Sequence, residues 1–373
     1  MIRVAIDATP LLGERTGVGA FADGAIEAIN RLDSVELVAF AITWRGRGGL
    51  GDVVPPGVRI PPLPMIARPL HSAWSRFDGP VIEWWTGRVD AVHGTNFVVP
   101  PAHKAAEVVS VHDLTMIRYP EFCQPATLRF PDLIRRALHR GAMVHTDSRF
   151  VAAEVVDTFG APAERVRAVP CGVPPELLAA PGPSEPADPS DRPYVLALAK
   201  TEPRKDLPGL VRAFDALAAT HPDHRLVIAG PVGWGEQTLA TAIDRARYRD
   251  RISRLGWVDR AERANLLRHA SAFAYPSVYE GFGFPPLEAM AAGVPVVATD
   301  GGSVPEVVDG AARIVPVGEP DALAAALSTV LDDEEERARL ISAGRWRAAE
   351  FTWERCAAGL VALYHDAIAL KSS

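Results

Sequence analysis

The stretch AFAYPSVYEGFGFPPLEAMAAGVPVVA, residues 272–298, decides the fold of the second half of this chain. It opens with an apolar run at 272–275 that predicts a buried strand, and a Gly- and Pro-rich turn and a helical run at 286–292 follow. A strand, a glycine turn and a helix N-terminus present backbone N–H groups to an anion. Glu280 and Glu288 flank the turn, and their carboxylates can accept hydrogen bonds from sugar hydroxyls. The stretch therefore predicts a site for a sugar attached to a phosphate.

The composition is that of a globular protein with two domains. The chain has 373 residues and a net charge of −7, which argues against a nucleic-acid partner. Cys123, Cys171 and Cys356 are scattered without a CxxC pair, which favours free thiols in a reducing cytoplasm. The N-terminal residues 1–6 read as a strand and not as a signal peptide, and no apolar run approaches the about 18 residues that span a bilayer. No clustered His or Cys set predicts a metal, and we expect no cofactor.

Strand-like and helix-like runs alternate along the chain, which predicts an α/β fold with parallel sheets. The segment 173–193 interrupts the alternation with seven prolines and reads as a linker. We therefore expect an N-terminal domain over 1–175, a C-terminal domain over 190–350 and a last helix over 352–370. A ligand is expected in the crevice between the domains, at the carboxyl ends of the strands. The predicted strands are 2–6, 35–41, 91–93, 108–112 and 143–146 before the linker, and 194–199, 226–229, 273–275, 294–298 and 314–317 after it.

A basic loop follows the first predicted strand of the C-terminal domain. Lys200, Arg204 and Lys205 cluster there, and Asp206 is placed to cap the helix that follows. Cations beside a helix N-terminus suit a diphosphate, which carries many acceptor oxygens. Taken alone, the loop is explained equally well as a solvated basic turn. The 280–288 turn in the same domain favours a diphosphate site instead.

Two loops of the N-terminal half also contain residues that could bind a ligand or take part in a reaction. The glycines at 13, 17 and 19 permit close backbone approach to a ligand, and a plain tight turn explains them equally well. His112 and Asp113 end a predicted strand, where α/β proteins hold reactive groups. A structural histidine, satisfied by hydrogen bonds within the protein, is the favoured alternative.

Taken in order, these motifs resemble those of the retaining glycosyltransferases of family 4, over nearly the whole chain. Residues 280–288, with the following AMAAGVPVV, resemble the E-x7-E signature, and residues 202–206, EPRKD, resemble the family's diphosphate loop E-P-R-K-N. Residues 17–19 match the N-terminal glycine loop, 111–114 match the H-D-L strand end, and 303–308 resemble the helix start that follows the signature.

The resemblance implies a GT-B fold, in which two Rossmann-like domains face across a cleft and the C-terminal helix returns to the first domain. The first domain would take the acceptor, and the second would hold the nucleotide-sugar donor. The implied catalytic residues are Glu280 on the sugar hydroxyls, Arg204 and Lys205 on the diphosphate, and His112 near the anomeric centre and the acceptor. The implied substrate-binding residues are Gly17, Gly19, Asp113, Val258 near the base, Gly283, Phe284, Pro285, Leu287, and Glu288 on the ribose.

The implied reaction is a metal-independent, retaining transfer of a hexose from a nucleoside-diphosphate sugar to a glycan, a lipid-linked or a small-molecule acceptor. GDP-mannose is the expected donor, because the H-D-L and E-P-R-K motifs resemble those of mannosyltransferase-like members. A sugar phosphorylase, a nucleotide-sugar epimerase and a non-catalytic sugar-nucleotide-binding protein are the alternatives. The expected place is the cytoplasm, including the inner face of the membrane.

The N-terminal half also contains an aromatic segment at 65–88 and a basic helical run around 130–138. Together they predict contact with a lipid-linked acceptor at an anionic membrane. An aromatic core beside a solvated basic face is the favoured alternative. The aromatic residues are Trp74, Phe77, Trp84 and Trp85, and the basic ones are Arg129, Arg135, Arg136 and Arg140.

Overall fold

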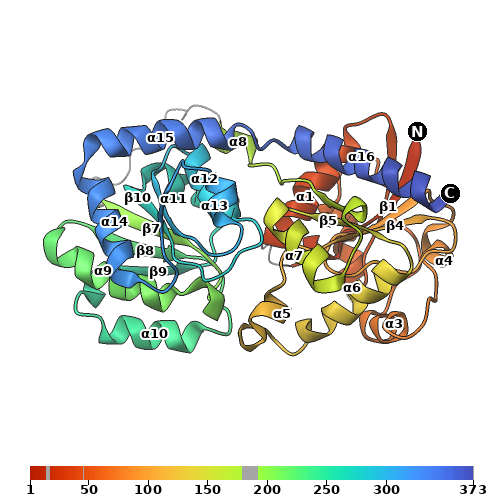
Figure 1. The fold of residues 1–373 in the computed structure, drawn as a ribbon, viewed down its shortest axis with the longest axis horizontal. Coiled ribbons are helices and arrows are strands. Elements are labelled where there is room, and N and C mark those ends of the chain that lie inside the picture. Colours follow the sequence, from red (N-terminus) through yellow and green to blue (C-terminus); the bar gives the residue numbers. More distant parts are fainter. Residues whose placement is uncertain (14–16, 45, 179–191, 373) are drawn as a thin grey trace. The chain divides into compact units, whose positions relative to one another are not determined.

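The computed structural model describes residues 1–13, 17–44, 46–178 and 192–372, which divide into two compact units (Figure 1). Unit 1 consists of Met1–Gly172 and Thr352–Ser373, and unit 2 consists of Val173–Phe351. Most of the predicted linker, residues 179–191, lies outside the described residues, and its first part forms the short helix α8 (Pro175–Leu178).

The described part of unit 1 contains a parallel sheet of six strands in the order β2-β1-β3-β4-β5-β6. The central strand β1 pairs with both neighbours, so that Ile2 lies opposite Val35 and Val4 lies opposite Ala91. The central strands are buried on both faces, as a parallel sheet covered by helices requires. The strands are β1 (Ile2–Asp7), β2 (Val35–Phe40), β3 (Ala91–Gly94), β4 (Ala106–Ser110), β5 (Met143–Thr146) and β6 (Val166–Ala168).

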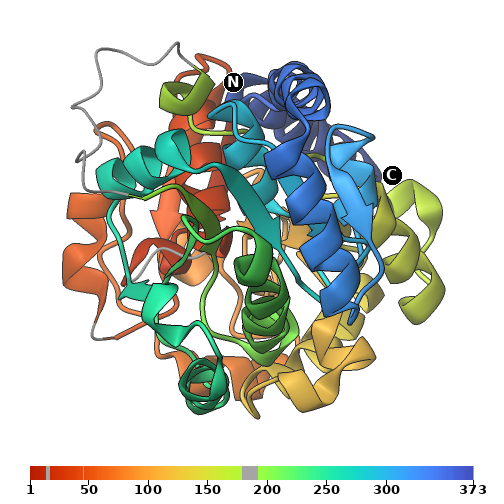
Figure 2. The ribbon, with the colours of Figure 1, turned by 90° about the vertical axis from the view of Figure 1, so that its left-hand side faces the viewer.

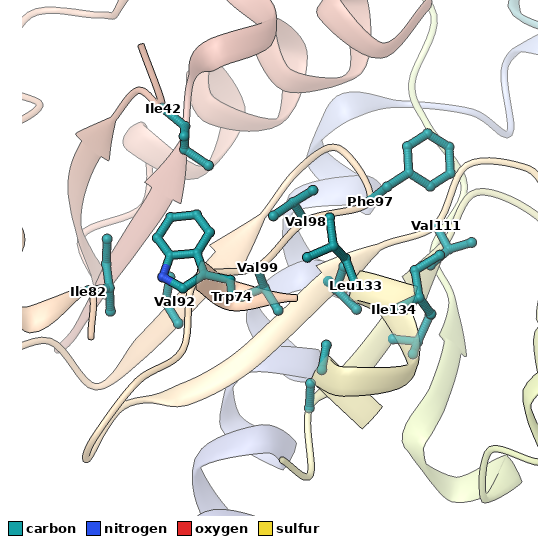
Figure 3. Close-up of a cluster of buried hydrophobic side chains, with 14 of the residues drawn as sticks. Ile42, Trp74, Ile82, Val92, Phe97, Val98, Val99, Val111, Leu133 and Ile134 are labelled. Carbon is teal, nitrogen blue, oxygen red and sulfur yellow. The ribbon is translucent and has the colours of Figure 1, made fainter. Parts of the chain in front are cut away.

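Helices of unit 1 cover this sheet and build its core around Trp74. Figure 3 shows Trp74 with Ile82 and Val92, and with Leu133 and Ile134 of α6. The indole N–H of Trp74 donates to the carbonyl of Pro80 at 3.0 Å, so the buried ring leaves no polar atom unpaired. The helices are α1 (Gly17–Asn30), α2 (Leu50–Val53), α3 (Ala67–Trp74), α4 (Glu83–Thr86), α5 (Thr115–Arg118), α6 (Phe130–His139), α7 (Arg149–Phe159) and α16 (Trp353–Ser372).

The C-terminal helix α16 belongs to unit 1, where it lies beside α1 (Figure 1). Gly24 of α1 faces the indole ring of Trp353, and a Cβ atom at residue 24 would come within 2.2 Å of that ring. Farther along α16, the buried hydroxyl of Tyr364 hydrogen-bonds Nδ1 of His93 in β3 at 2.8 Å. The predicted return of the last helix to the first domain is therefore confirmed.

Unit 2 contains a second parallel sheet, with six described strands in the order β12-β11-β10-β7-β8-β9. Helices lie on both of its faces (Figures 1 and 2). On one face, Val195 and Ala197 of β7 pack with Leu210 of α9 and Leu327 of α14. The strands are β7 (Tyr194–Leu198), β8 (Arg225–Ala229), β9 (Ile252–Gly256), β10 (Ala272–Tyr275), β11 (Val296–Thr299) and β12 (Arg313–Val315). Besides α8, the helices are α9 (Leu207–Thr220), α10 (Glu236–Arg245), α11 (Arg260–His269), α12 (Phe284–Ala291), α13 (Val304–Val308), α14 (Pro320–Asp332) and α15 (Glu334–Ala348).

Each predicted strand is present, with its ends displaced by one or two residues at most. The strands β6 and β9 were not predicted. Both lie at an edge of their sheet, and their residues are mostly half-buried, so neither forms the apolar run that marks the central strands. None of the described helices is long and apolar enough to cross a membrane.

The contact between α1 and α16 yields a prediction about Gly24. Replacing a helical glycine by alanine normally favours the helix by about 1 kcal/mol. We expect Gly24→Ala to do the opposite and to destabilise unit 1 by about 1–3 kcal/mol, because the added methyl overlaps the Trp353 ring. Urea unfolding would measure the change. Gly51→Ala in α2 is the control, since its Cβ would meet no atom closer than 4.0 Å, and equal stability of the two variants would contradict the packing described.

Candidate active site

Two loops of unit 2 meet at the carboxyl edge of its sheet. The strands β7 and β10 are neighbours, with Ala272 opposite Val195, so the loops at 199–206 and 276–283 leave the sheet side by side. The N–H of Val278 donates to the carbonyl of Arg204 at 2.7 Å and ties the two loops together. The basic loop and the turn that contains Glu280 are therefore in contact at this edge of the sheet.

Glu280 is the centre of this site. One carboxylate oxygen, Oε2, accepts a hydrogen bond from Arg204 Nη1 at 2.7 Å, and the other, Oε1, accepts one from Lys205 Nζ at 2.5 Å. The carboxylate is 5% exposed. Burial alone would raise the pKa of Glu280, but the charges of Arg204 and Lys205 outweigh it and lower the pKa to about 2. Glu280 is therefore a permanent carboxylate at neutral pH.

Lys205 is as buried as the carboxylate it contacts. Its ammonium also donates to the hydroxyl of Tyr275 at 3.2 Å and lies 5.3 Å from the centre of that ring. Burial, with the like charge of Arg204, lowers the pKa of Lys205 below its ordinary value, although Glu280 opposes the change. Tyr275 was not among the predicted site residues, because its place in an apolar strand gave no sign of a polar contact.

The site as a whole carries an excess of positive charge. Arg204 Nε donates to Glu202 Oε2 at 3.2 Å, and Lys200 Nζ lies 3.8 Å from Glu202 Oε1. Three cations thus face two carboxylates in this cluster of described residues, which leaves one positive charge in excess. An anion that enters here meets charged donors that are already held in place.

Glu288 forms a second ion pair, on the helix α12. Its Oε2 accepts from both Nε and Nη2 of Arg263 in α11, with Nε at 3.0 Å. The helical run was expected to begin at 286, and this was wrong: α12 begins at Phe284, so Glu288 lies beyond its first turn, which has no acidic residue. Arg263 was missed, because its contact with Glu288 joins two helices and leaves no local pattern in the sequence.

The turn before α12 is held rigidly from one side. Gly283 has a φ of 112°, which a side chain would strain, and it precedes the first helical residue. The hydroxyl of Ser303 donates to the carbonyls of Glu280 and Phe282 at 3.1 and 3.0 Å. Pro285 and the proline after it have no backbone N–H to donate at the start of α12, and the N–H of Leu287 donates to the carbonyl of Gly283 at 3.5 Å.

The remaining predicted residue of unit 2, Val258, lies in the loop after β9. It is half-buried, and the indole of Trp257 beside it is 56% exposed. In the loop after the neighbouring strand β8, the ring centre of Trp234 lies 5.3 Å from the ammonium of Lys200. Aromatic surface is therefore present on the two loops that follow β8 and β9.

In unit 1, the predicted residues occupy separate places. His112 lies two residues beyond β4, and protein atoms hydrogen-bond both of its ring nitrogens. Asp113 is engaged locally, because its Oδ1 accepts from the N–H of Thr115, the first residue of α5, at 2.9 Å. Gly17 and Gly19 lie in the first described turn of α1 and not in a loop, and residues 14–16 of the predicted glycine loop lie outside the described residues.

The aromatic segment and the basic helix of unit 1 divide between core and surface. Trp74 is core, and Trp85 donates to the carbonyl of Pro64, whereas Phe77 and Trp84 are 66% and 71% exposed. The basic residues are largely paired within the protein. Arg140 is bound to Glu107, Arg136 to Asp78 and Arg135 to Asp132. No group of three or more His, Cys, Asp or Glu side chains within the described ranges could hold a metal ion.

The ion cluster yields a prediction about stability and pH. We expect Glu280→Gln to lower the free energy of unfolding by about 3 kcal/mol at neutral pH, which is the equivalent of a pKa lowered from 4.5 to about 2. A lowered carboxylate pKa stabilises the fold above pH ~4.5, and this stabilisation is lost as the pH falls towards ~2. The difference between the two proteins should therefore shrink over that range.

Urea unfolding at a series of pH values would measure this difference. The control is Glu319→Gln, which changes an exposed carboxylate of the same unit. A gap between wild type and Glu280→Gln that is as large at pH ~3 as at pH ~7 would contradict the assigned ion cluster.

Comparisons with known proteins show which family the chain belongs to. Residues 16–172 match the model of the glycosyl transferase 4-like domain, and residues 183–347 match that of glycosyl transferases group 1. The chain is 31% identical over 283 residues to O-antigen chain mannosyltransferase B of Escherichia coli, which is 73% of either chain. It is 32% identical over 247 residues to the MMP alpha-(1->4)-mannosyltransferase of Mycolicibacterium hassiacum, which covers 64% of this chain and 58% of that one.

A solved structure shares the fold at lower identity. Sucrose-phosphate synthase from Thermosynechococcus elongatus superposes with a TM-score of 0.76 at 20% identity, over 99% of this chain and 100% of that chain. The chain therefore belongs to the family 4 glycosyltransferases and has the GT-B fold of that family.

Proposed function

We propose that this protein is a retaining, metal-independent hexosyltransferase that uses a nucleoside-diphosphate sugar, with GDP-mannose as the donor. The observation that carries the proposal is the buried carboxylate of Glu280 held between Arg204 and Lys205. A sugar diphosphate needs both kinds of group, because its hydroxyls require acceptors and its phosphates require cationic donors.

Donor binding would exchange partners within the cluster. Arg204 and Lys205 would donate to the diphosphate, and the Glu280 carboxylate would accept from hydroxyls of the sugar. The phosphates would replace part of the negative charge that now surrounds the two cations, so neither cation would be left buried without a partner.

The same cations would lower the barrier to bond cleavage. Breaking the glycosidic bond leaves a nucleoside diphosphate with increased negative charge, and fixed cations stabilise that charge as it develops. Losing one such donor typically costs about 3–4 kcal/mol in the barrier. Arg204 and Lys205 would supply what a metal ion supplies elsewhere, and the backbone around Gly283, Phe284, Pro285 and Leu287 would seat the sugar and the phosphates.

The nucleoside would lie along the loops that follow β9 and on α12. Glu288 receives both Arg263 donors on Oε2, and Oε1 is not part of that pairing. Oε1 would then accept from the ribose hydroxyls, while Val258 would meet the base. A neutralised carboxylate in a fixed orientation is a good acceptor for a pair of vicinal hydroxyls, because it loses little freedom on binding.

Retention could proceed through a covalent intermediate or by same-face attack, and among the described residues of the site no carboxylate is an obvious nucleophile for the first route. Glu280 is occupied by two cations, so attack by the acceptor on the same face as the leaving group is the simpler route. The name of the Mycolicibacterium relative includes an alpha-(1->4) linkage, and GDP-mannose carries an α-linked sugar, which agrees with retention. The names of both relatives support mannose as the sugar that is transferred.

A sugar phosphorylase, a nucleotide-sugar epimerase or a non-catalytic binding protein would share the fold, and product analysis separates them. An epimerase would convert the nucleotide sugar to its epimer with no net release of nucleoside diphosphate, and a phosphorylase would require inorganic phosphate. A binding protein would release none under any condition. A transferase releases it in step with acceptor consumption.

The first experiment is a thermal-shift panel with GDP, GDP-mannose, UDP and UDP-glucose. GDP and GDP-mannose should raise the melting temperature most, because the proposed donor site would bind them with the lowest Kd. A ligand at 100 times its Kd adds about 2.7 kcal/mol of apparent stability. Arg204→Met should abolish the shift, whereas Arg245→Met, at an exposed position of the same unit, should keep it. NMR of the mannose released by slow hydrolysis should show the α anomer first.

Two outcomes would contradict the proposal. A larger shift with UDP or UDP-glucose would overturn the donor, and β-mannose as the first product would overturn retention. A full shift in Arg204→Met would remove the assignment of the basic loop to the diphosphate.

The acceptor would bind unit 1. A pocket of about 750 Å³ beside Gly13 has a mixed lining, in which Thr9, Thr43 and Asp52 lie among leucines, glycines and a valine, and its polar residues suit a hydroxylated acceptor. Unit 1 also exposes an apolar surface formed by Leu63, Ile66, Phe77 and Trp84. Arg68 and Arg76 are exposed within the same segment, and the combination suits a lipid-linked acceptor at an anionic membrane of the cytoplasmic face.

A double variant, Phe77→Ser with Trp84→Ser, tests the membrane contact. Burying one such side chain in a membrane contributes about 1.5–3 kcal/mol, so the variant should bind anionic vesicles more weakly by tenfold or more, roughly. Co-sedimentation at low salt measures the change. Trp346→Ser is the control, because Trp346 is equally exposed but lies in unit 2. Wild-type protein that does not sediment with these vesicles would remove the membrane from the proposal.

A further inference from the structure

The ring of His112 joins segments that follow neighbouring strands of unit 1. Its Nδ1 lies 2.6 Å from Oδ2 of Asp147, which follows β5, and its Nε2 lies 2.7 Å from the carbonyl oxygen of Thr95, which follows β3. His112 itself follows β4, so one imidazole fastens the carboxyl ends of β3, β4 and β5. Its side chain and that of Asp147 are both nearly inaccessible to solvent.

The partners fix how many protons the ring carries. The carbonyl of Thr95 can only accept, so Nε2 must be protonated. Asp147 also accepts from the thiol of Cys171 on its other oxygen, Oδ1, at 3.3 Å. Burial alone would raise the pKa of Asp147, but the charge of His112 and the hydrogen bond between them outweigh it and lower that pKa, so the carboxylate is ionised. Nδ1 then donates to Oδ2, and the ring is an imidazolium with no lone pair.

The charges around His112 agree with this count. Burial alone would lower the pKa of His112, but the Asp147 carboxylate outweighs it and raises that pKa, with a smaller contribution from Asp113. His93 and His145, the other titratable groups packed nearby, have lowered pKa values because they are buried, so they are neutral. Phe21 and Phe97 pack against the ring with their centres 5.2 and 5.6 Å away, and they carry no charge.

We propose that Asp147 is a positioning residue that keeps His112 as a fixed imidazolium, and that His112 serves transfer through its charge and position and not as a proton acceptor. The inference rests on the proposed function and on the role that the family resemblance implies for His112, near the anomeric centre and the acceptor. A neutral histidine with one unprotonated nitrogen could act as a general base. A ring whose nitrogens both donate within the protein cannot take a proton from the acceptor hydroxyl.

The wild-type protein tests the proton count without any turnover. NMR of protein labelled with ¹⁵N-histidine at pH ~7 should show both ring nitrogens of His112 protonated, with the signal assigned by its loss in His112→Gln. A His112 ring with one unprotonated nitrogen would overturn the proposal. This measurement stands even where no donor is turned over, so it separates this inference from the proposed function.

Asp147→Asn tests the consequence for the reaction. Without its counter-charge, His112 should lose its second proton at a lower pH, and each unit of that change lowers the imidazolium fraction about tenfold above both pKa values. The ratio of wild-type to variant kcat should therefore rise as the pH is raised from about 5.5 to about 8. A ratio that stays constant with pH would mean a merely structural role and would overturn the proposal.

Glu107→Gln is the matched control. Glu107 is a buried carboxylate of β4 that pairs with Arg140 and does not touch His112. It should lower stability while leaving the pH dependence of kcat unchanged. If Asp147→Asn does not fold, the NMR measurement on the wild-type protein decides.

Discussion

The structure of unit 2 depends on how a buried carboxylate is compensated. Glu280 lies out of water at the end of a parallel sheet, where an unpaired charge would cost several kcal/mol. Arg204 and Lys205 offset that cost from the neighbouring loop. The two loops must therefore stay together. The backbone hydrogen bond from Val278 to Arg204 joins them, and the hydrogen bond from Ser303 to the carbonyl of Glu280 fixes the turn.

Unit 1 also buries a charged group, but there the buried charge is positive. There the buried charge at the carboxyl ends of the strands is carried by an imidazole ring, and Asp147 is the counter-ion. In both units the compensating partner comes from the segment after an adjacent strand, because parallel strands bring those segments to one edge. The same topology thus places a charged group in each unit without any long-range loop.

Much of this could be predicted from the sequence, and the parts that could not have a common cause. Apolar runs located the central strands, and the spacing of Glu280 and Glu288 drew attention to the candidate site, because both signals are local. The ion pair of Glu288 with Arg263 and that of His112 with Asp147 join residues 25 and 35 positions apart, and no local pattern records them. Trp74 and Trp84 lie in one short segment, yet only the fold decides that the first is core and the second is surface.

The place of α16 has a consequence for the order in which the protein is assembled during synthesis. The helix supplies Trp353 and Tyr364 to unit 1, but it follows all of unit 2 along the chain. On the ribosome, unit 2 can emerge whole while the surface of α1 around Gly24 and the imidazole of His93 still lack their partners. Unit 1 can acquire its final packing only after the last helix has left the exit tunnel, which reverses the usual order in which the N-terminal domain is completed first.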